Sequence, residues 1–415
     1  MSSVESALLR SKRALSILCI APFAPPVNHA EPIQVGRYLS ELLRTDEVAL
    51  VSERPTGSWS VVDPALAITA ENLRRLDLAL PLHSIASRLF SLNLWDRLPY
   101  RPRHWSMAHV RRIARWAGDV DIIYSRSMPP RAAVLAKKLR FLLRKPWIMH
   151  LSDPWADSPH LPRSTDRSRE EADERACFLA ADAISFTTAA VADFYRAKYP
   201  SRRERMFVSP NVFPPGAERA PLRRIRQGPL RLVYTGALYG NRQPNILIEA
   251  IEGLPVEWQG MVKLVIAGNA TSQALETISR ADPGVVEYRG HLSFADSAAL
   301  QQGADLLVTL EDGNGHPLDG TFLLSKLLDY LPTGIPLLCL TTEGSVTQEL
   351  VDKKYGWALP SKDRQAITDL LLRLLSGAAV KEMEGFSTDL PTELRAINAV
   401  AVLRDKMSQL VGLPC

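Results

Sequence analysis

The sequence of 415 residues contains no apolar stretch near the roughly 20 residues that a membrane-spanning helix requires. It has four cysteines, Cys19, Cys177, Cys339 and Cys415, and no two of them have the spacing of a zinc or redox motif. The apolar segment 15–24 leads into a proline-rich loop without the small-residue cleavage site of a secretion signal. These absences predict a cytoplasmic protein with buried thiols at positions 19 and 339.

Familiar nucleotide and metal motifs are also missing. Gly313-Asn314-Gly315 lacks the third glycine of a dinucleotide fingerprint, and no phosphate-binding loop with a lysine is present. Asp119-Val120-Asp121 has the form of a metal-binding Asp-x-Asp, but it precedes its expected strand, whereas ligand-bearing loops of parallel sheets follow one. We expect a helix-to-strand turn there, no metal site and no cofactor.

What is present is a regular alternation of short apolar runs with helical patterns, which is typical of parallel βαβ units. Strands are predicted at 15–21, 48–52, 122–125, 147–151, 183–187, 206–208, 230–235, 262–267, 285–288, 306–310, 336–340 and 356–359. Helices are predicted between them, among others at 131–143, 190–198, 245–252, 295–302, 322–331 and 364–375. The expected fold class is α/β, with two doubly wound, Rossmann-like domains facing each other across a cleft at the carboxyl ends of their strands.

Prolines and glycine at 210–216 interrupt the alternation and predict the domain organisation. We expect an N-terminal domain at 1–209, a linker at 210–229, a C-terminal domain at 230–390, and a final helix within 391–415 that packs back across the junction. Residues 1–215 hold 31 Lys and Arg against 22 Asp and Glu, whereas the remaining residues are acidic in balance. This asymmetry suggests different partners for the two domains.

The segment 323–336 combines a predicted helix with residues suited to a nucleotide. Lys326 stands at the start of this helix, where an ammonium and backbone N–H groups suit a diphosphate. Ser325 and Asp329 share a helix face, and an aspartate there can accept hydrogen bonds from the two hydroxyls of a ribose. An exposed lysine and aspartate on a surface helix is the simpler alternative.

This segment, Ser325-Lys326-Leu327-Leu328-Asp329-Tyr330, resembles the donor-binding signature of retaining glycosyltransferases of family 4. The resemblance implies the GT-B fold, a ribose contact by Asp329, and a donor-sugar contact at the place that holds Thr321. The family has a glutamate at that place, and we expect His316 or Asp319 of the preceding loop to substitute for it.

Two further segments of the C-terminal half resemble the same family. Gly236-Ala237-Leu238-Tyr239-Gly240-Asn241-Arg242 follows a predicted strand, and its glycines would allow a phosphate to approach the backbone while Arg242 binds it. The family's usual arginine after the glycine is replaced by Ala237. Gly290-His291-Leu292 lies where the family places the nucleobase, although His291 by itself reads as an ordinary loop histidine.

In the N-terminal half, His150-Leu151-Ser152-Asp153-Pro154-Trp155 resembles the family segment that faces donor phosphate and acceptor. Asp153 matches the family's aspartate, Ser152 replaces its usual His or Arg, and His150 is on the same strand face as Ser152. The loop with Pro26, Asn28 and His29 corresponds to the family's acceptor loop but lacks its paired glycines.

Residues 83–116 carry seven arginines against one acid, with Trp95, Trp105 and Trp116 among them. One interpretation is a solvated basic face with its tryptophans packed inward. The other is peripheral contact with anionic lipid headgroups at the inner face of the cell membrane. No recognition motif accompanies the charge, so we do not expect nucleic-acid binding.

The sequence therefore predicts a metal-independent, hexosyltransferase-like glycosyltransferase of polysaccharide or glycoconjugate synthesis. Its substrates would be a UDP- or GDP-sugar donor and a glycan or polyprenyl-diphosphate-linked acceptor, and the resemblance implies retention of configuration. Arg242, Lys326, Asp153 and His150 are the expected catalytic residues. A nucleotide-sugar epimerase or hydrolase on the same fold, and a non-catalytic GT-B-like binding subunit, are the alternatives.

Overall fold

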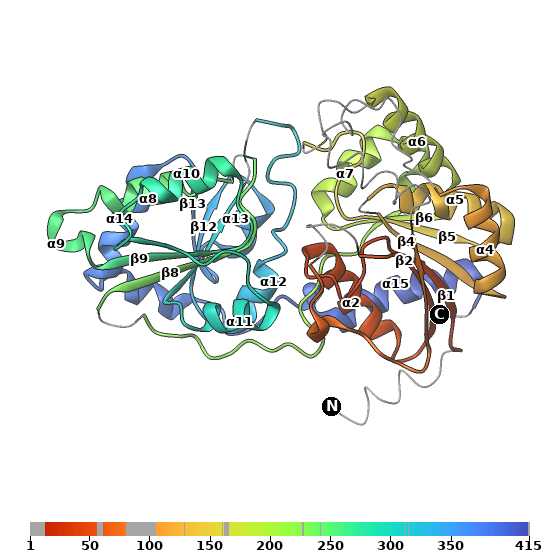
Figure 1. The fold of residues 1–415 in the computed structure, drawn as a ribbon, viewed down its shortest axis with the longest axis horizontal. Coiled ribbons are helices and arrows are strands. Elements are labelled where there is room, and N and C mark those ends of the chain that lie inside the picture. Colours follow the sequence, from red (N-terminus) through yellow and green to blue (C-terminus); the bar gives the residue numbers. More distant parts are fainter. Residues whose placement is uncertain are drawn as a thin grey trace. The chain divides into compact units, whose positions relative to one another are not determined.

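The computed structural model describes residues 13–55, 61–79, 105–127, 129–159, 161, 166–225, 228–240, 242–311, 313 and 315–413. The chain forms two compact units. Unit 1 consists of residues up to Pro210 together with the segment from Ala396 onward, and unit 2 runs from Asn211 to Arg395. Each unit contains one parallel sheet with helices packed on it (Figure 1).

The sheet of unit 1 has seven parallel strands in the order β3-β2-β1-β4-β5-β6-β7. In chain order the strands are β1 (Ser16–Ile20), β2 (Glu47–Glu53), β3 (Leu73–Leu78), β4 (Ile122–Ser127), β5 (Trp147–Leu151), β6 (Ala183–Phe186) and β7 (Met206–Val208). Every residue of β5 and β6 is buried, as expected for central strands covered on both faces. The edge strand β3 was missed by the sequence analysis because only Leu78 of its six residues is buried, so it forms no apolar run.

The helices of unit 1 connect these strands. They are α2 (Ala30–Leu42), α4 (Met107–Ala117), α5 (Arg131–Leu143), α6 (Arg167–Ala180), α7 (Ala189–Lys198) and α15 (Ala396–Val411). Side-chain caps fix two of their starts, since Asp166 accepts a hydrogen bond from the N–H of Arg169 and Thr188 accepts one from the N–H of Val191. The predicted final helix thus begins at Ala396 and belongs to unit 1, where it packs against α2.

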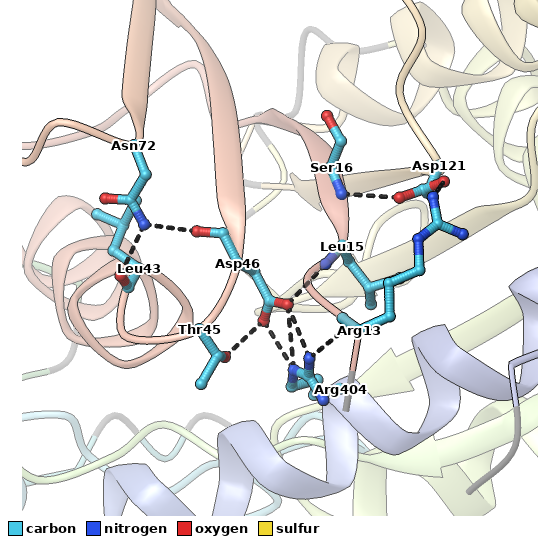
Figure 2. Close-up of polar contacts among 9 residues, drawn as sticks. All are labelled: Arg13, Leu15, Ser16, Leu43, Thr45, Asp46, Asn72, Asp121 and Arg404. Carbon is cyan, nitrogen blue, oxygen red and sulfur yellow. Dashed lines mark hydrogen bonds and ion pairs between the residues drawn. The ribbon is translucent and has the colours of Figure 1, made fainter. Parts of the chain in front are cut away.

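A buried ion pair attaches α15 to the rest of unit 1 (Figure 2). The guanidinium of Arg404 donates to both carboxylate oxygens of Asp46, with the shortest distance 2.8 Å, and also to the carbonyl oxygen of Arg13 at 3.0 Å. Asp46 in turn accepts from the backbone N–H of Leu15 at 2.9 Å, just before β1. The Asp46 side chain is fully buried, so one carboxylate joins the start of the first strand to the last helix.

The sheet of unit 2 has six parallel strands in the order β10-β9-β8-β11-β12-β13. They are β8 (Leu230–Thr235), β9 (Val262–Ala267), β10 (Val286–Tyr288), β11 (Leu306–Leu310), β12 (Leu337–Thr341) and β13 (Gly356–Pro360). The helices are α8 (Asn245–Glu252), α9 (Val256–Gln259), α10 (Ser272–Arg280), α11 (Phe294–Gln302), α12 (Leu327–Tyr330), α13 (Val346–Val351) and α14 (Arg364–Leu375). Strand order reverses between β8 and its neighbour β11, which places a topological switch point there.

Alternating side chains of the unit 2 strands build two apolar layers. Leu338 and Leu340 of β12 pack with α8, α10 and α14, whereas Leu337 and Cys339 pack with α12 and α13 on the opposite face. Cys19, Cys177 and Cys339 are buried free thiols, which confirms the prediction for positions 19 and 339. In the part of the chain that the structure describes, no helix has the length and apolarity needed to cross a bilayer.

The predicted linker enters unit 2 as irregular chain that packs on the α12–β12 turn. The N–H of Ala220 donates to the carbonyl of Pro332 at 2.8 Å, and the N–H of Arg223 donates to that of Gly334 at 2.9 Å. A Cβ at Gly334 would lie 2.4 Å from the carbonyl oxygen of Pro221, so only glycine permits this approach. The segments by which the chain enters and leaves unit 2 lie side by side, and the N–H of Phe213 in the first donates to the carbonyl of Leu394 in the second at 3.0 Å.

Candidate functional site

The turns that follow β8, β9 and β10 pack backbone against backbone through three glycines. The N–H of Gly236 donates to the carbonyl of Ala267 at 2.8 Å, and the N–H of Gly268 donates to that of Gly290 at 2.7 Å. A Cβ at Gly268 would lie 2.1 Å from the carbonyl oxygen of Gly236. All three glycines have positive φ, which disfavours a side chain, and at Gly268 the close backbone also leaves no space for one. The carboxyl ends of these three strands therefore present backbone that a ligand can approach closely.

Lys326 fills the space that the missing side chain of Gly236 leaves. Its Nζ would lie 2.9 Å from a Cβ at position 236, and it sits 3.6 Å from the ring centroid of Tyr234. The residue is partly exposed, but Nζ itself is shielded from solvent and has no hydrogen-bond partner among the residues that the structure describes. Burial, and secondarily the charge of Arg242, hold the pKa of Lys326 well below its usual range. A buried amino group beside an aromatic ring can take up a proton when an anion binds next to it.

Arg242 supplies a second cation to the same neighbourhood. Its guanidinium stacks on the ring of Tyr239 at 4.8 Å and donates from one terminal nitrogen to the Tyr239 hydroxyl at 3.1 Å. Its Nε is buried and finds no hydrogen-bond partner in the described part of the chain. The charge of Arg242 also lowers the pKa of Lys326. The turn at Gly240, with φ of 58°, leads the chain from Tyr239 to Arg242.

The helix predicted at 322–331 is much shorter in the structure. The α-helix spans Leu327–Tyr330 and continues as a 3-10 turn at Leu331–Thr333, so Ser325 and Lys326 lie in the preceding turn rather than inside a helix. Asp329 is half-buried in this single helical turn. The hydroxyl of Tyr330 is 2.8 Å from the N–H of Thr235 and fastens the turn to the end of β8. Strand attachment, and not a helix dipole, therefore positions Lys326.

The loop that was expected to contact the donor sugar is held by hydrogen bonds among its own residues. The carboxylate of Asp319 accepts from the N–H of His316 at 2.8 Å, and Nδ1 of His316 accepts from the N–H of Leu318 at 3.2 Å. The hydroxyl of Thr321 donates to the carbonyl of Leu318 at 2.7 Å. These three side chains thus shape the loop.

The sequence analysis missed Glu311, which directly follows β11. This carboxylate is 7% exposed, and its Oε2 accepts from the N–H of Thr342 at 2.8 Å. Burial raises the pKa of Glu311 above the usual range, while the hydroxyls of Thr347 and Ser345 and the charge of Arg242 oppose that rise. Its position directly after a strand at the switch point was the available signal.

The remaining predicted donor contacts lie at the end of β10. Gly290 has φ of 65°, and its carbonyl is held by the N–H of Gly268. His291 is exposed and Leu292 is half-buried. The hydroxyl of Tyr288 donates to the carbonyl of Gly268 at 2.7 Å and fixes the two turns together. This strand end therefore offers exposed backbone and one exposed imidazole.

In unit 1, Asp153 follows β5 in a loop that is bonded firmly to two helices. The N–H of Trp155 donates to the hydroxyl of Tyr195 at 2.9 Å, and its indole donates to Glu170 at 2.6 Å. The N–H of Ala156 donates to the fully buried carboxylate of Glu174 at 2.9 Å. Asp153 itself is half-buried, so the loop holds it at the carboxyl end of the sheet of unit 1.

His150 lies in the interior of unit 1. It is fully buried, with Nδ1 3.0 Å from the hydroxyl of Ser185, and its Nε2 has no hydrogen-bond partner within the described ranges. Burial and the nearby Arg126 hold the pKa of His150 well below its usual range, so the ring is neutral. Arg126 is also buried, pairs with Glu31 at 3.1 Å, and stacks on Tyr38. His150 therefore packs in the interior of unit 1, next to the carboxyl end of β5.

The loop after β1 is tied to the segment before β3. The N–H of Asn28 donates to the carbonyl of Val61 at 2.8 Å, and the carbonyl of Pro26 accepts from the N–H of Asp63 at 2.8 Å. His29 is exposed at the position before α2. The loop has no glycine, but Gly36 of α2 lets Pro25 pack against that helix, since a Cβ there would lie 2.9 Å from the Pro25 ring.

The basic stretch 83–116 is described from residue 105 onward, and Arg88, Arg97, Arg101, Arg103 and Trp95 lie outside the described residues. Trp105 is 2% exposed, and Trp116 is covered by the guanidinium of Arg74 at 5.4 Å. Arg111, Arg112 and Arg115 are exposed on α4. The two described tryptophans thus face the protein, and the arginines face solvent. Asp119 and Asp121 lie between α4 and β4, where they pair with Lys145 and Arg13, as a helix-to-strand turn predicts.

The chain has two parallel α/β units, and the second carries cationic side chains and accessible backbone at its switch point. This combination is typical of two-domain nucleotide-binding folds. Residues 42–212 match the family model described as "Glycosyl transferase 4-like domain", and residues 229–377 match "Glycosyl transferases group 1". The chain belongs to the glycosyltransferases with the GT-B fold. No curated protein sequence matches it.

Solved structures with the same fold are distant in sequence. The chain is similar to Anabaena HepE in complex with UDP and glucose, at 14% identity over 96% of this chain and 97% of that one, with a TM-score of 0.59. It is also similar to WaaG, a glycosyltransferase involved in lipopolysaccharide biosynthesis, at 15% identity over 95% and 100%, with a TM-score of 0.59. A UDP-N-acetylglucosamine 2-epimerase of Listeria monocytogenes, described as putative in its own structure, aligns at 15% identity over 97% and 98%, with a TM-score of 0.57.

Proposed function

We propose that the protein transfers a hexosyl group from a UDP- or GDP-sugar to a glycan or a polyprenyl-diphosphate-linked acceptor, with retention of configuration and without a metal. The observation that carries the proposal is the buried amino group of Lys326 beside Gly236, which has no hydrogen-bond partner among the described residues, together with the buried Nε of Arg242, for which the described residues also offer none. Burial opposes a positive charge on either group, and a bound anion offsets that cost. A diphosphate is the anion that this class of enzyme releases.

The chemistry follows from where charge develops. The bond between the anomeric carbon and the diphosphate oxygen breaks, and a new bond forms between that carbon and the acceptor oxygen. Negative charge collects on the leaving diphosphate, where Lys326 and Arg242 would stabilise it more strongly than in the ground state. The acceptor proton passes to the departing diphosphate, so no strong enzyme base is needed.

The remaining candidates are assigned by their places in the fold. We assign the nucleobase to the backbone at Gly290, His291 and Leu292, and the ribose to Asp329, with Ser325 near the diphosphate. Gly236, Tyr239 and Gly240 form the turn over which the diphosphate would lie. The structure of HepE with UDP and glucose supports a uridine donor for this fold. Asp153 and the loop of Pro26, Asn28 and His29 are assigned to the acceptor side.

A donor panel with UDP-, GDP- and ADP-sugars, followed by release of the nucleoside diphosphate, tests the proposal. With the active donor, Lys326→Ala and Arg242→Ala should each lower turnover by about 100-fold, the usual effect of removing one charge-stabilising donor. Arg280→Ala is the matched control, because Arg280 is exposed and pairs only with Glu276 among the described ion pairs. Wild-type turnover in Lys326→Ala would remove this lysine from the mechanism.

A nucleotide-sugar epimerase or hydrolase is the second candidate, favoured by the fold that the Listeria epimerase shares. An isotopically labelled donor distinguishes the reactions. Transfer predicts that label appears in a larger product only when acceptor is added. Isomerised or hydrolysed sugar at the same rate without acceptor would establish the second candidate. A binding subunit would bind nucleoside diphosphate and turn over no donor.

We also propose a peripheral membrane contact at the inner face of the cell membrane through α4. The exposed Arg111, Arg112 and Arg115 support an electrostatic contact with anionic headgroups. Because Trp105 is buried, its ring does not take part in this contact. Cosedimentation with vesicles that contain phosphatidylserine should fall in a triple Arg→Gln variant at these positions. Binding of the variant equal to wild type would exclude α4 as the contact.

A further inference from the structure

Arg219 lies in the irregular segment that leads the chain into unit 2, and its side chain joins three parts of that unit. The guanidinium donates from Nη1 to the carbonyl oxygen of Leu331 and from Nε to that of Ser387, the latter at 3.1 Å. It also stacks on the ring of Tyr355, with Cζ 4.9 Å from the ring centroid. The contacted residues are more than 100 positions away from Arg219 in the sequence.

The positive charge of Arg219 forms no ion pair with a carboxylate in the described ranges, and burial lowers the pKa of this residue. An arginine is therefore a costly choice for a position that only has to be filled. A methionine would occupy similar space without this cost, but it has no hydrogen-bond donor. What the arginine adds here is its hold on two main-chain carbonyl oxygens.

The carbonyl of Leu331 ends the same turn that begins with Lys326. The N–H of Tyr330 donates to the carbonyl of Lys326 at 3.0 Å, so the turn and this lysine move together. On one side the hydroxyl of Tyr330 fastens the turn to the N–H of Thr235, at the end of β8. On the other side Arg219 holds it through Leu331, as basic side chains commonly do at the last carbonyls of a helix.

We propose that Arg219 is a positioning residue of the candidate diphosphate site, which holds this turn so that the amino group of Lys326 stays beside Gly236. The inference rests on the proposed function. Arg219 acts through the turn, because two of its three nitrogens already donate to main-chain carbonyls. Without this hold, a smaller fraction of molecules presents Lys326 correctly, and the apparent affinity for a diphosphate falls by that fraction.

Titration calorimetry with UDP, GDP and ADP tests the inference on wild type, Arg219→Met, Lys326→Met and the double variant. Arg219→Met should weaken binding of the preferred nucleotide about 10-fold, the size expected for a lost hydrogen bond from a charged group. The same change made in Lys326→Met should cost less than about 3-fold, because the amino group that Arg219 positions is already gone. Such non-additivity is not expected of a residue that only adds stability.

Two further variants complete the comparison. Arg223→Met is the matched control, since its guanidinium donates to the carbonyl of Gln302 at the end of α11, and it should bind nucleotide as wild type does. Arg219→Lys keeps the charge and can donate to one carbonyl, so it should recover part of the affinity lost in Arg219→Met. It also carries the comparison if the methionine variant does not fold.

Hydrogen exchange tests the hold in the free protein. The amides of Asp329 and Tyr330 should exchange faster in Arg219→Met than in wild type or Arg223→Met. The main-chain hydrogen bond from Ala220 to Pro332 remains in this variant, so the rest of unit 2 should keep its protection. Unchanged exchange at Asp329 and Tyr330 would show that Arg219 does not hold the turn.

The binding results separate this inference from the proposed function. Equal nucleotide affinity in wild type and Arg219→Met would overturn the inference and leave the proposed function standing. An equal loss in the wild-type and Lys326→Met backgrounds, with a lowered melting temperature, would assign Arg219 to stability alone. If wild type binds none of the three nucleotides, the proposed function fails and Arg219 has no site to position, whatever the exchange rates are.

Discussion

The Nζ of Lys326 lies 3.6 Å from the ring centroid of Tyr234, in the space that a side chain at Gly236 would occupy. Tyr234 is the penultimate residue of β8 and Lys326 is in the turn before α12, so residues 92 positions apart meet at one strand end.

Gly236→Ala should remove nucleoside diphosphate binding while leaving a folded protein. The added methyl would meet Nζ of Lys326 at 2.9 Å, and the φ of 138° is strained for any residue with a Cβ. Gly228→Ala is the control, since its φ is 123° but no atom of the described residues lies within 4 Å of the added carbon. Both variants should lose about 1–3 kcal/mol of unfolding free energy, and only Gly236→Ala should fail to shift its melting temperature with UDP or GDP. Equal ligand shifts in the two would contradict the site.

Binding of a nucleoside diphosphate should be accompanied by proton uptake at Lys326. Burial and Arg242 depress the pKa of this lysine in the free protein, and a bound anion raises it again. Affinity should therefore fall as pH rises from the free-state pKa to the bound-state pKa. Titration calorimetry in two buffers of different ionisation enthalpy measures the protons taken up, and Lys326→Met should abolish the uptake. Equal uptake in wild type and Lys326→Met would assign the proton to another group.

Replacing Asp46 by Ala should destabilise unit 1 strongly. The substitution leaves the guanidinium of Arg404 buried without its carboxylate, which typically costs about 3–5 kcal/mol. Chemical denaturation measures the loss. Asp46→Leu combined with Arg404→Leu should recover part of it, because no uncompensated charge remains. Glu276→Gln, in an exposed pair with Arg280, should change stability by less than about 0.5 kcal/mol.

Glu174→Gln should loosen the loop that carries Asp153. The buried carboxylate accepts from Lys198 at 2.6 Å, from the hydroxyl of Tyr199 at 2.7 Å and from the N–H of Ala156 at 2.9 Å. An amide has one acceptor fewer and leaves a buried donor unpaired. Hydrogen exchange at 154–158 should become faster, with exchange in unit 2 unchanged. Protection equal to wild type at Ala156 would show that Glu174 does not hold the loop.

The strands were predictable from sequence because central parallel strands are apolar on both faces. Leu306–Leu310 and Trp147–Leu151 were found at their observed bounds. The edge strand β3 was not found, since Arg74, Arg75 and Asp77 interrupt any apolar pattern. The helix at 322–331 was predicted too long: its leucines are spaced for a helix, but Leu323 and Leu324 pack on the core as irregular chain.

Site residues were predictable only where a local pattern marks them. Lys326 and Arg242 lie near recognisable turns, and the structure places Lys326 against Gly236 at the end of β8. Glu311 was missed although it directly follows a predicted strand, because its burial against Thr342, 31 positions later in the chain, is not recorded by any local spacing. The glycine that permits close packing near Pro25 is on α2 at Gly36, and not in the loop where the motif was sought.

The pairing of Asp46 with Arg404 bears on how the chain is made. Domains fold largely as they emerge from the ribosome, beginning with the N-terminal one. Here the carboxylate near the start of the first sheet has to wait for an arginine translated 358 residues later. Unit 2, a continuous segment from Asn211 to Arg395, can reach its native state first. Synthesis of the final helix is therefore the step that completes the unit begun earliest.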